Sequence, residues 1–423
     1  MPAPLEGIRV IDFGIAVQGP LAATFLADMG AEVIKIELPT GDGCRWNLGP
    51  SDFPEEASGS PMFLSANRGK RYMHLDAHTE ESRQVLYKLV ESADVFVTNY
   101  REAAMQRLGL DYDSLAKVNP RLIYGAVSGF GHKGPVAANP MYDLFAQARS
   151  GLPSVTGQLD DVPTLPGAVL ADQGGATMLA LGIMTALVAR ERHGVGQKVD
   201  TSGYGALAWL QSWELTHTGL TGQVRDRAGS YHPLIVGSYG IYRTSDDKAI
   251  AYMDMLSDKG FEKFCAFGGI PELASDGRFD SMRKRVGLGG AEAARIASEQ
   301  RAPLERAFAS HTLAEWKAFL DELGPEEAMY QEVLDYQEIL DDPQALACEY
   351  IIERDIPGVG RKKLTGNPIT LSKTPSRVGE PGGEIGQNNE EILLELGYDW
   401  DFISKLREQT QVAADAAFPE LEE

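Results

Sequence analysis

Residues 8–37 of the chain read IRVIDFGIAVQGPLAATFLADMGAEVIKIE, and this segment sets the architecture of the whole protein. Apolar β-type runs at its two ends predict strands, and the apolar segment between them predicts a helix that follows a glycine-containing turn. The predicted bounds are Ile8–Phe13 for the first strand, Gly14–Pro20 for the turn, Leu21–Met29 for the helix and Glu32–Glu37 for the second strand. Such a βαβ unit joins two parallel strands through a crossover helix.

The same alternation continues through the first half of the chain. Strands that alternate with helices in this way favour a parallel, doubly wound sheet and the α/β class. Further strands are expected at Tyr72–Leu75, Asp94–Thr98, Leu122–Val127 and Val195–Ser202, and helices at Glu80–Ser92, Gly174–Arg190 and Gly205–Leu220.

The pattern changes after Thr221, where a polar, turn-rich segment begins. A hairpin, three helices, a short strand and a last helix are then expected, which is typical of a second, smaller α+β domain followed by a return segment. Their bounds are Ser238–Thr244 and Lys248–Asp254 for the hairpin, Asp258–Phe267, Ala291–Ala309 and Leu313–Leu323 for the helices, Tyr350–Arg354 for the strand and Asn389–Leu396 for the last helix.

The charge balance excludes several kinds of partner. The chain of 423 residues has 39 Lys and Arg against 61 Asp and Glu, which gives a net charge of -22. Nucleic-acid binding needs a basic face, and an anionic membrane surface would repel this chain. An anionic ligand must therefore meet a local positive site, because the overall field opposes it.

Nothing in the sequence points to secretion, membrane insertion or a metal. The three cysteines, Cys44, Cys265 and Cys348, stand far apart and the histidines are scattered, so neither disulfides nor a zinc site is expected. The N-terminus lacks a basic segment followed by an apolar run. The longest nearly apolar segment, Ala176–Ala189, is shorter than the ~20 residues that span a bilayer. We expect a cytoplasmic protein without a metal.

The turn after the first strand invites a comparison with dinucleotide-binding proteins. Residues 14–19 read GIAVQG, which lacks the G-x-G-x-x-G spacing that brings a backbone close to a pyrophosphate. An NAD-dependent dehydrogenase is therefore a weak alternative, and a plain βαβ unit whose turn needs glycine explains the pattern.

A second candidate segment, residues 166–175, reads PGAVLADQGG and leads into the helix predicted from Gly174. Asp172 there has two interpretations. It can cap the helix N-terminus, or it can act as a nucleophile, because a carboxylate with a pKa near ~3.9 is ionised at neutral pH without a general base. In the second case the N–H groups of Gly174 and Gly175 would stabilise a developing oxyanion, together with the helix dipole.

Short motifs follow one another along nearly the whole chain. They are LEGIRVIDFG and VQGPLAATFLADMGAEVIKIE near the start, GDGCR at 41–45, NRGKR at 67–71, ADVFVTNY at 93–100, NPRLIYGAVSGFGHKGP at 119–135, YDLFAQARSG at 142–151, LADQGG at 170–175 and GVGQKVDTS at 194–202. In order and spacing they resemble the class III CoA-transferases, the family that includes formyl-CoA transferase, carnitine CoA-transferase and 2-methylacyl-CoA racemase.

The resemblance implies a domain organisation. A large Rossmann-like α/β domain is built from both chain ends, a smaller α+β domain is joined to it by long linkers, and the ring-shaped subunit forms an interlocked dimer. The implied bounds are 1–194 and 341–423 for the large domain, 231–323 for the small domain, and 195–230 and 324–340 for the linkers.

The resemblance also implies a nucleophile. The family's catalytic aspartate carries over onto Asp172, which would form a mixed anhydride with the donor acyl group and then an aspartyl-CoA thioester. A glutamine of the family's V-Q-x-G-P turn contacts the intermediate. This chain reads Val17-Gln18-Gly19-Pro20 without the spacer. The role therefore goes to Gln18, although an ungapped match would put Val17 at that position.

CoA enters as a thioester substrate, and no prosthetic group is implied. Two basic contacts of formyl-CoA transferase are replaced, by Leu38 and Pro140, so the phosphates must meet other cations. The implied CoA-binding positions are Val17, Leu75, Asn99, Tyr100, Arg107, Tyr142 and Asp143. The cations that could replace the two lost contacts are Arg45, Arg71, Arg101 and Lys133.

Three alternatives stay open beside a homodimeric transferase. A racemase would place a histidine where this chain has Tyr142, which is a poor base at neutral pH. The chain could also be a non-catalytic CoA-binding subunit, or one part of a heteromer with a related subunit. The glycine-rich loop of formyl-CoA transferase is missing at residues 227–233, where His232 could touch a substrate or have no role.

Overall fold

A computed structural model describes residues 2–46, 53–54 and 58–417 of the chain. The chain divides into two compact units. Unit 1 comprises Met1–Ser150, Gly167–Leu210 and Leu340–Glu423, and unit 2 comprises Gly151–Pro166 and Gln211–Ile339. Unit 1 therefore contains segments from both ends of the chain.

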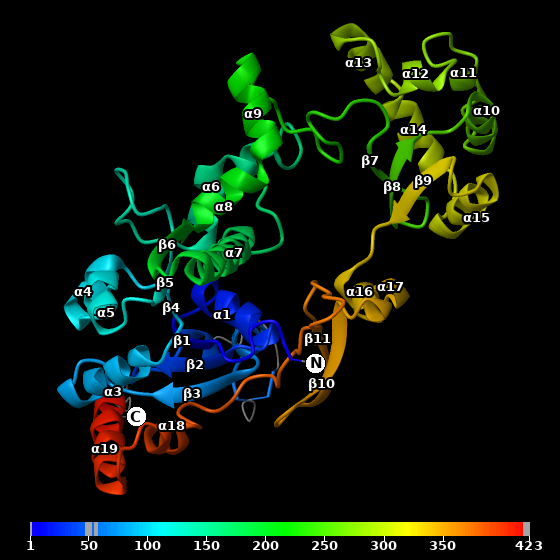
Figure 1. The fold of residues 1–423 in the computed structure, drawn as a ribbon. Coiled ribbons are helices and arrows are strands. Elements are labelled where there is room, and N and C mark those ends of the chain that lie inside the picture. The colour runs from blue at the N-terminus through cyan, green and yellow to red at the C-terminus, as the bar shows by residue number, and fades with distance from the viewer. Residues whose placement is uncertain (1, 47–52, 55–57, 418–423) are drawn as a thin grey trace, which may run out of the picture. The chain divides into compact units, whose positions relative to one another are not determined.

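A six-stranded parallel sheet with the order β3-β2-β1-β4-β5-β6 forms the centre of unit 1 (Figure 1). The strand order reverses between β1 and β4, which makes that point the topological switch of a doubly wound sheet. The strands are β1 (Arg9–Phe13), β2 (Glu32–Glu37), β3 (Lys70–His74), β4 (Val95–Thr98), β5 (Ile123–Ser128) and β6 (Gln197–Ser202). The predicted α/β class and the parallel sheet are confirmed.

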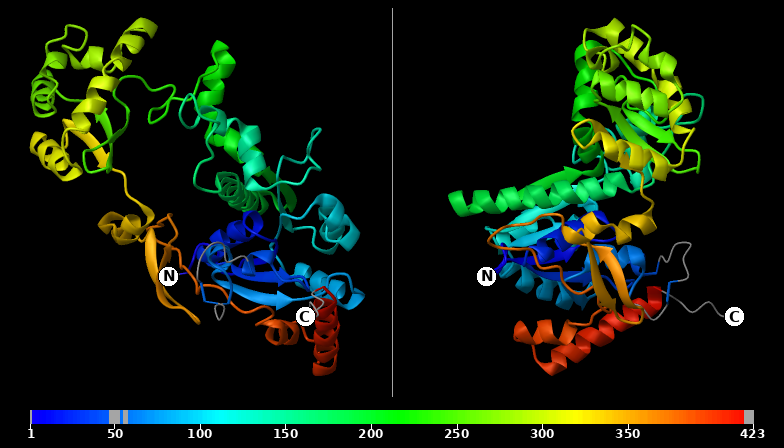
Figure 2. Two further views of the ribbon diagram at one scale, coloured as in Figure 1. Left: turned by 180° about the vertical axis from the view of Figure 1, so that it is seen from behind. Right: turned by 90° about the vertical axis from the view of Figure 1, so that its right-hand side faces the viewer.

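Helices cover both faces of this sheet (Figure 2). On one face α1 (Gln18–Asp28) and α7 (Leu170–His193) pack against the strands and against each other. On the other face α3 (Glu80–Glu91) buries its apolar side together with the C-terminal helices α18 (Asn389–Glu395) and α19 (Trp400–Ala417). Residues from both ends of the chain therefore share this hydrophobic core.

The other elements of unit 1 are short. They are η1 (Gly43–Arg45), α2 (Pro61–Asn67), α4 (Glu102–Leu108), α5 (Tyr112–Val118), α6 (Asp143–Ser150), α8 (Gly203–Leu210), α17 (Pro343–Ala347) and the hairpin of β10 (Ile351–Ile356) and β11 (Gly360–Thr365).

Unit 2 contains a three-stranded antiparallel sheet of β7 (Gly240–Arg243), β8 (Ala249–Asp254) and β9 (Ala328–Glu332). The predicted hairpin is confirmed by the β7–β8 pair. Aromatic rings fill the core, where Trp316 packs on Phe264 and Phe308 at 5.1 and 4.6 Å between ring centroids. The remaining elements are η2 (Leu152–Val155), α9 (Ser212–Thr221), α10 (Asp258–Phe267), α11 (Pro271–Ala274), α12 (Met282–Arg285), α13 (Ala291–Ser298), α14 (Arg301–Phe308), α15 (Leu313–Leu323) and, after β9, α16 (Tyr336–Asp341).

Some predicted boundaries were wrong. The helix expected over Ala291–Ala309 is two helices, because Pro303 cannot donate within a helix and fits only the first turn of α14. The helix expected over Gly205–Leu220 is also two, α8 and α9. The helix after Asp172 begins four residues earlier than predicted, at Leu170. Asn389–Leu396 is not the last helix, since α19 follows it and buries Ile403 and Leu406.

Candidate active site

Gln18 and Asp172 meet where α1 and α7 begin. Gln18 is the first residue of α1, and its Nε2 donates a hydrogen bond of 2.7 Å to Oδ1 of Asp172. Gln18 is buried, whereas Asp172 is partly exposed. Val17 is the N-cap residue of α1, and its side chain makes no capping hydrogen bond. The structure therefore brings Gln18, rather than Val17, to Asp172.

Two glycines make room for the Gln18 side chain. A Cβ on Gly175 would lie 3.3 Å from Cδ and Oε1 of Gln18, and a Cβ on Gly203 would lie 3.0 Å from its Nε2. The predicted oxyanion role of Gly174 and Gly175 is wrong, because both residues lie within α7, where their N–H groups belong to the helical hydrogen-bond ladder. The glycines provide space, and the nearby donor is the amide of Gln18.

Asp143 caps the N-terminus of α7. Its Oδ1 accepts hydrogen bonds from the backbone N–H groups of Ala171 at 2.8 Å and Asp172 at 3.2 Å. The N-cap position itself is held by Val169, which has no side-chain acceptor. Gln147 Nε2 donates to the other oxygen of Asp143. The interpretation of Asp172 as the capping residue is therefore wrong, since α6 supplies the cap.

The surroundings of Asp172 raise its pKa above the ordinary value for aspartate. Burial is the main cause; the hydrogen bond from Gln18 lowers the pKa, and the negative charge of Asp143 raises it. Cys44 is a nearby titratable group, and burial, with Asp42 and Asp172 adding to its effect, raises the pKa of this thiol to about 12. The thiol stays neutral at physiological pH, which leaves Asp172 as the stronger nucleophile of the two.

The Asn99 side chain is hydrogen-bonded to the β1–α1 turn at the sheet's switch point. Its Oδ1 accepts from the N–H of Ile15 at 2.8 Å, and its Nδ2 donates to the carbonyl of Ile15 at 2.7 Å. A Cβ on Gly14 or on Gly19 would lie 3.2 Å from Oδ1 of Asn99. The turn glycines thus admit an asparagine where a dinucleotide-binding protein admits a pyrophosphate, which argues against the NAD alternative.

The other predicted CoA-binding positions lie in different environments. Leu75 is fully buried in the core, so only its backbone could meet a ligand. Tyr100 is partly buried and packs on Phe13 with 5.4 Å between ring centroids. Arg107 is exposed in the last turn of α4, and Tyr142 is 76% exposed just before α6. The positions after β1, β3 and β4 share the carboxyl edge of the sheet, where ligands bind in doubly wound folds.

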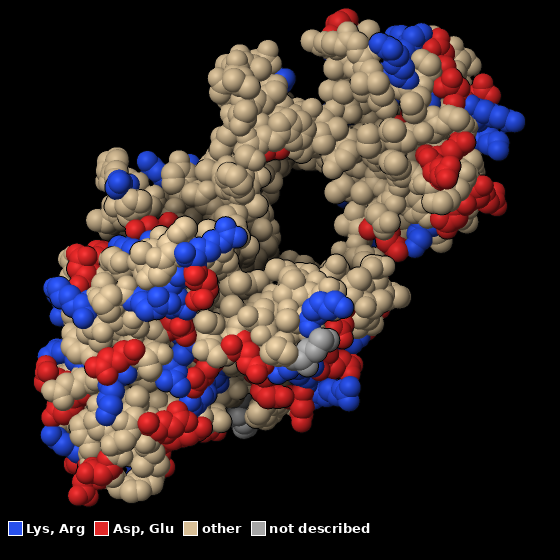
Figure 3. All heavy atoms as spheres, viewed as in Figure 1, with Lys and Arg blue, Asp and Glu red and all other residues tan. Residues whose placement is uncertain are grey.

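Two of the candidate cations are already paired with carboxylates. Arg45 is buried and holds both oxygens of Glu37, at 2.7 and 2.6 Å. Arg71 forms ion pairs with three glutamates, Glu32, Glu391 and Glu395. Figure 3 shows acidic and basic side chains intermingled over unit 1. Among the described residues, the exposed side chains of Arg101, Arg107 and Lys133 form no ion pair.

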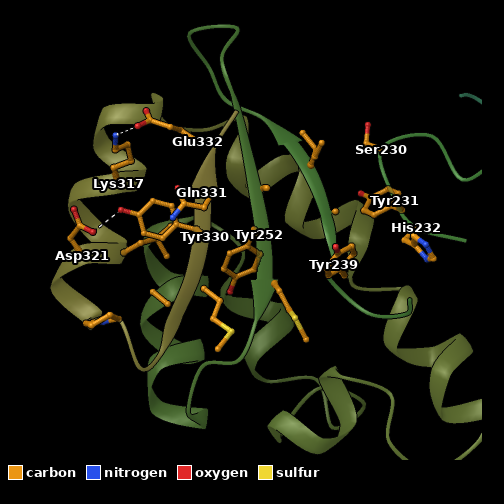
Figure 4. A pocket seen from close by; sticks show the side chains of 18 of the residues that line it. Ser230, Tyr231, His232, Tyr239, Tyr252, Lys317, Asp321, Tyr330, Gln331 and Glu332 are labelled. Atoms are coloured by element: carbon orange, nitrogen blue, oxygen red, sulfur yellow. Dashed lines mark hydrogen bonds and ion pairs between the residues drawn. The ribbon is translucent and has the colours of Figure 1, made fainter. Parts of the chain in front are cut away.

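His232 has structural partners within unit 2. Its ring stacks on Trp213 with 5.4 Å between centroids, and its Nε2 lies 3.4 Å from Oε1 of Glu214. The N–H of Leu234 donates to Nδ1 of His232. His232 and Tyr239 line a cavity of about 1010 Å³ on the β7–β8–β9 sheet. Figure 4 shows both side chains at this cavity. These contacts account for His232 without a substrate.

The described part of the chain offers no cluster of three or more His, Cys, Asp or Glu side chains suited to a metal ion. Within that same part, no helix combines the length and apolar character needed to cross a membrane.

The site thus consists of an amide, Gln18, and a partly exposed carboxylate, Asp172, on a doubly wound α/β unit. The model of CoA-transferase family III matches residues 5–389, and the chain belongs to this family.

Curated relatives and a solved structure agree with this assignment. The chain is 35% identical to the acetyl-CoA:oxalate CoA-transferase of Acetobacter aceti over 372 residues, which cover 87% of this chain and 89% of the relative. It is 32% identical to the succinyl-CoA:mesaconate CoA-transferase of Haloarcula hispanica over 407 residues, 93% of this chain and 96% of the relative. The crystal structure of a CAIB/BAIF family protein from Brucella suis superposes with a TM-score of 0.81 at 30% identity, covering 94% of this chain and 100% of that one.

Proposed function

We propose that this protein moves CoA from an acyl-CoA donor to a carboxylic acid through covalent intermediates on Asp172. The hydrogen bond between Gln18 and Asp172 is the observation that supports this most directly. It fixes one carboxylate oxygen at 2.7 Å from an amide nitrogen. The other oxygen, Oδ2, has no hydrogen-bond partner among the described residues and belongs to a partly exposed side chain. Oδ2 is therefore the attacking atom.

The reaction balances without a redox partner or net proton transfer. Oδ2 of Asp172 attacks the thioester carbonyl carbon, so that a C–O bond forms, the C–S bond breaks and CoA leaves as a thiolate. The thiolate then attacks Cγ of Asp172, releasing the donor carboxylate and leaving an aspartyl-CoA thioester. The acceptor carboxylate attacks Cγ and displaces CoA as a thiolate, which gives a second mixed anhydride. The thiolate attacks the acceptor's acyl carbon, the C–O bond to Asp172 breaks, and acceptor-CoA and the free Asp172 carboxylate result. Each attack conserves the energy of an activated acyl bond.

Gln18 is the donor that can stabilise the negative charge of these steps. The N–H groups of Ala171 and Asp172 at the start of α7 are occupied by Asp143. Nε2 of Gln18 therefore supplies a fixed dipole close to the reacting carboxyl group. A raised pKa makes the Asp172 carboxylate more basic, and thus more nucleophilic once ionised, than an exposed aspartate.

The family and the exposed cations that form no ion pair among the described residues support a proposal for the substrate classes. CoA binds as a thioester substrate rather than as a prosthetic group, and its phosphates meet Arg107, aided by Arg101 and Lys133. Asn99, Tyr100 and the backbone near Leu75 border the same edge of the sheet. Because the two relatives are named for oxalate and mesaconate, we propose a small dicarboxylic acid as the acceptor.

The predicted assembly remains part of the proposal. We propose an interlocked homodimer of ring-shaped subunits that acts in the cytoplasm. Of the residues 195–230 expected to form a linker, strand β6 and helix α8 instead belong to unit 1. Unit 1 exposes large apolar side chains on two helices, Leu181 at 60% and Trp209 at 68%, and exposed apolar surface of this kind marks interfaces. Its cysteines and that of unit 2 are free thiols, as a reducing compartment would keep them.

Substitution of the nucleophile tests the proposal. The wild-type protein is screened with acetyl-CoA and succinyl-CoA against small carboxylic acids, and products are read by mass spectrometry. Asp172→Ala should abolish transfer, whereas Asp113→Ala, an exposed aspartate in the first turn of α5, should leave it intact. Full transfer by Asp172→Ala would contradict the proposal. Deuterium exchange at Cα without an acceptor would instead support the racemase alternative.

A further inference from the structure

The turn between β1 and α1 is held by side chains from three other places in the sheet. Four backbone N–H and C=O groups of residues 14–16, just before Gln18, form hydrogen bonds of 2.7 to 3.1 Å with these side chains. Lys35 Nζ on β2 donates to the carbonyl of Gly14 at 2.9 Å, Asn99 after β4 binds both polar groups of Ile15, and Oδ1 of Asp42 accepts from the N–H of Ala16 at 3.1 Å. A fourth side chain, Lys70 on β3, donates to the carbonyl of Pro20 at 2.8 Å.

Three of these four holding side chains, Lys35, Asp42 and Lys70, are buried charges. Lys35 Nζ lies 3.1 Å from Oδ2 of Asp42, and Lys70 Nζ lies 2.8 Å from Oδ2 of Asp12, with every one of these side chains at most 1% exposed. Although burial alone lowers the pKa of Lys35, the carboxylates of Asp12 and Asp42 raise it above the ordinary value, so the ammonium stays charged. The attraction within a buried ion pair is largely offset by the free energy needed to remove both charges from water, so such a pair adds little to the stability of the fold. Their retention beneath this turn calls for another reason.

The turn also contains a strained residue. Ala16 has a φ of 59°, in the left-handed region that residues with a Cβ disfavour. Its N–H is the group that Asp42 binds. Such strain persists where the surroundings fix a conformation, and it concentrates at functional sites. Two residues further on, Gln18 reaches Asp172.

We propose that Asp42, held by Lys35, is a positioning residue that fixes the β1–α1 turn so that the amide of Gln18 meets the carboxylate of Asp172. Asp42 does not touch the reacting atoms. It acts through Ala16, while Lys35 acts through Gly14. The inference rests on the proposed roles of Gln18 and Asp172 and adds to them the source of their alignment. Misplacement of a catalytic group by about 1 Å can cost ~100-fold in rate.

A merely structural role and a positioning role predict different kinetics for Asp42→Asn. This variant keeps an oxygen that can accept from Ala16 but removes the charge that pairs with Lys35. If Asp42 positions Gln18, kcat should fall by about 10- to 100-fold while KM for the acyl-CoA changes by less than ~2-fold. The acid limb of the pH–rate profile should move to higher pH, because the Gln18 hydrogen bond that lowers the pKa of Asp172 is weakened.

A double-mutant cycle isolates the route of the effect. In a Gln18→Leu background, adding Asp42→Asn should change kcat by less than ~2-fold, because the group that Asp42 positions is already gone. In the Asp42→Asn background, Ala16→Gly should restore part of kcat, since glycine adopts the left-handed conformation without strain. Independent, multiplicative losses in the double variant, or an unmoved acid limb, would overturn the inference.

Asp28→Asn is the matched control. Asp28 is also buried and paired, with Arg68 at 2.8 Å, but it lies at the far end of α1, about 15 Å along the helix from Gln18. The Asp28→Asn variant should have lower thermal stability but an unchanged kcat and acid limb. A fall in kcat as large as that of Asp42→Asn would contradict the inference.

If Asp42→Asn does not fold, Asn99→Ala tests whether the turn depends on its side-chain bonds. This variant removes both bonds to Ile15 from a partly exposed position without breaking a buried ion pair. Because Asn99 also borders the proposed CoA edge, a change in KM for acyl-CoA is assigned to binding, and only kcat and the acid limb are read for positioning. The same fall in kcat and the same shift of the acid limb are expected, and their absence would overturn the inference. Full activity of Asp172→Ala would remove the proposed function itself. If the Asp172 and Gln18 variants lose activity as expected while the Asp42 and Asn99 variants keep the wild-type kcat, only the positioning role is contradicted.

Discussion

Buried charge pairs dominate the candidate active site of unit 1, whereas aromatic rings dominate the core of unit 2, which also contains the buried pair of Asp254 and Arg285. Beneath the β1–α1 turn lie paired charges such as Lys35–Asp42 and Lys70–Asp12, all at most 1% exposed. Beneath the β7–β8–β9 sheet lie rings such as Trp316 packed on its aromatic neighbours. Charges and hydrogen bonds fix atoms in direction, whereas ring packing fixes a shape and contributes most of its stability through burial.

This difference predicts that substitutions in the two regions affect different properties of the protein. Changes to polar groups around Asp172 should alter kcat and the pH dependence in directions that can be calculated. Changes in unit 2 should alter stability and leave the chemistry of the folded protein nearly unchanged.

The largest effect short of removing Asp172 is expected for Gln18→Leu. Loss of a single preorganised donor lowers kcat by about 100- to 1000-fold in comparable sites. The acid limb of kcat should also move to higher pH, because the hydrogen bond from Gln18 lowers the pKa of Asp172. Gln84→Leu, an exposed position on α3, is the control. Unchanged kcat and pH dependence in Gln18→Leu would break the comparison.

Asp143→Asn should shift the pH profile in the opposite direction. The negative charge of Asp143 raises the pKa of Asp172, so its removal should move the acid limb to lower pH. The weaker cap on α7 should reduce kcat by about 10-fold. Asp111→Asn alters a comparable cap on α5, where Asp111 accepts from Ser114, and should leave the pH profile unmoved. A shift of the Asp143→Asn limb to higher pH would contradict the electrostatic account.

Arg107→Ala separates binding from chemistry within unit 1. If this exposed guanidinium, which forms no ion pair with any described residue, meets a CoA phosphate, KM for acyl-CoA should rise about 10-fold with kcat nearly unchanged. The effect should diminish at high salt. Lys117→Ala, an exposed cation at the end of α5, should change neither constant. An unaltered KM for Arg107→Ala would show that other groups hold the phosphates.

The smallest effect is expected in unit 2, for His232→Ala. Loss of the stack on Trp213 and of the pair with Glu214 should cost about 1 kcal/mol of stability. Transfer activity of the folded protein should change by less than ~3-fold, which steady-state kinetics beside a thermal melt can establish. A fall in kcat/KM larger than that of Arg107→Ala would place His232 at the substrate. The expected difference between the two units would then be wrong.

The sequence allowed the parallel sheet to be predicted because each strand is a local apolar run with helices between. β2 and α15 occupy their predicted bounds, Glu32–Glu37 and Leu313–Leu323. The helix α19 was missed although its buried residues Ile403, Leu406 and Thr410 follow the i, i+3, i+7 spacing of a helix face, because only two of these three residues are apolar.

The site was predicted in part. Local sequence suggested Asp172 as a cap or nucleophile, and the family motifs pointed to Gln18. Asp143 caps α7 through Ala171 and Asp172, which follow it in the chain by 28 and 29 positions. No local sequence pattern reveals a contact over that separation. Lys35 gave a usable signal, as a lone cation within the apolar strand EVIKIE, but its partner Asp42 becomes evident only in three dimensions.

Trapping of the covalent intermediate tests the central claim most directly. The protein is incubated with acyl-CoA donor, treated with hydroxylamine or borohydride, digested and examined by mass spectrometry. The account predicts a donor-dependent modification on the peptide that contains Asp172, absent from Asp172→Ala and from protein treated without the donor. Rapid transfer of CoA with no modification at Asp172, or the same modification in the Asp172→Ala protein, would contradict it.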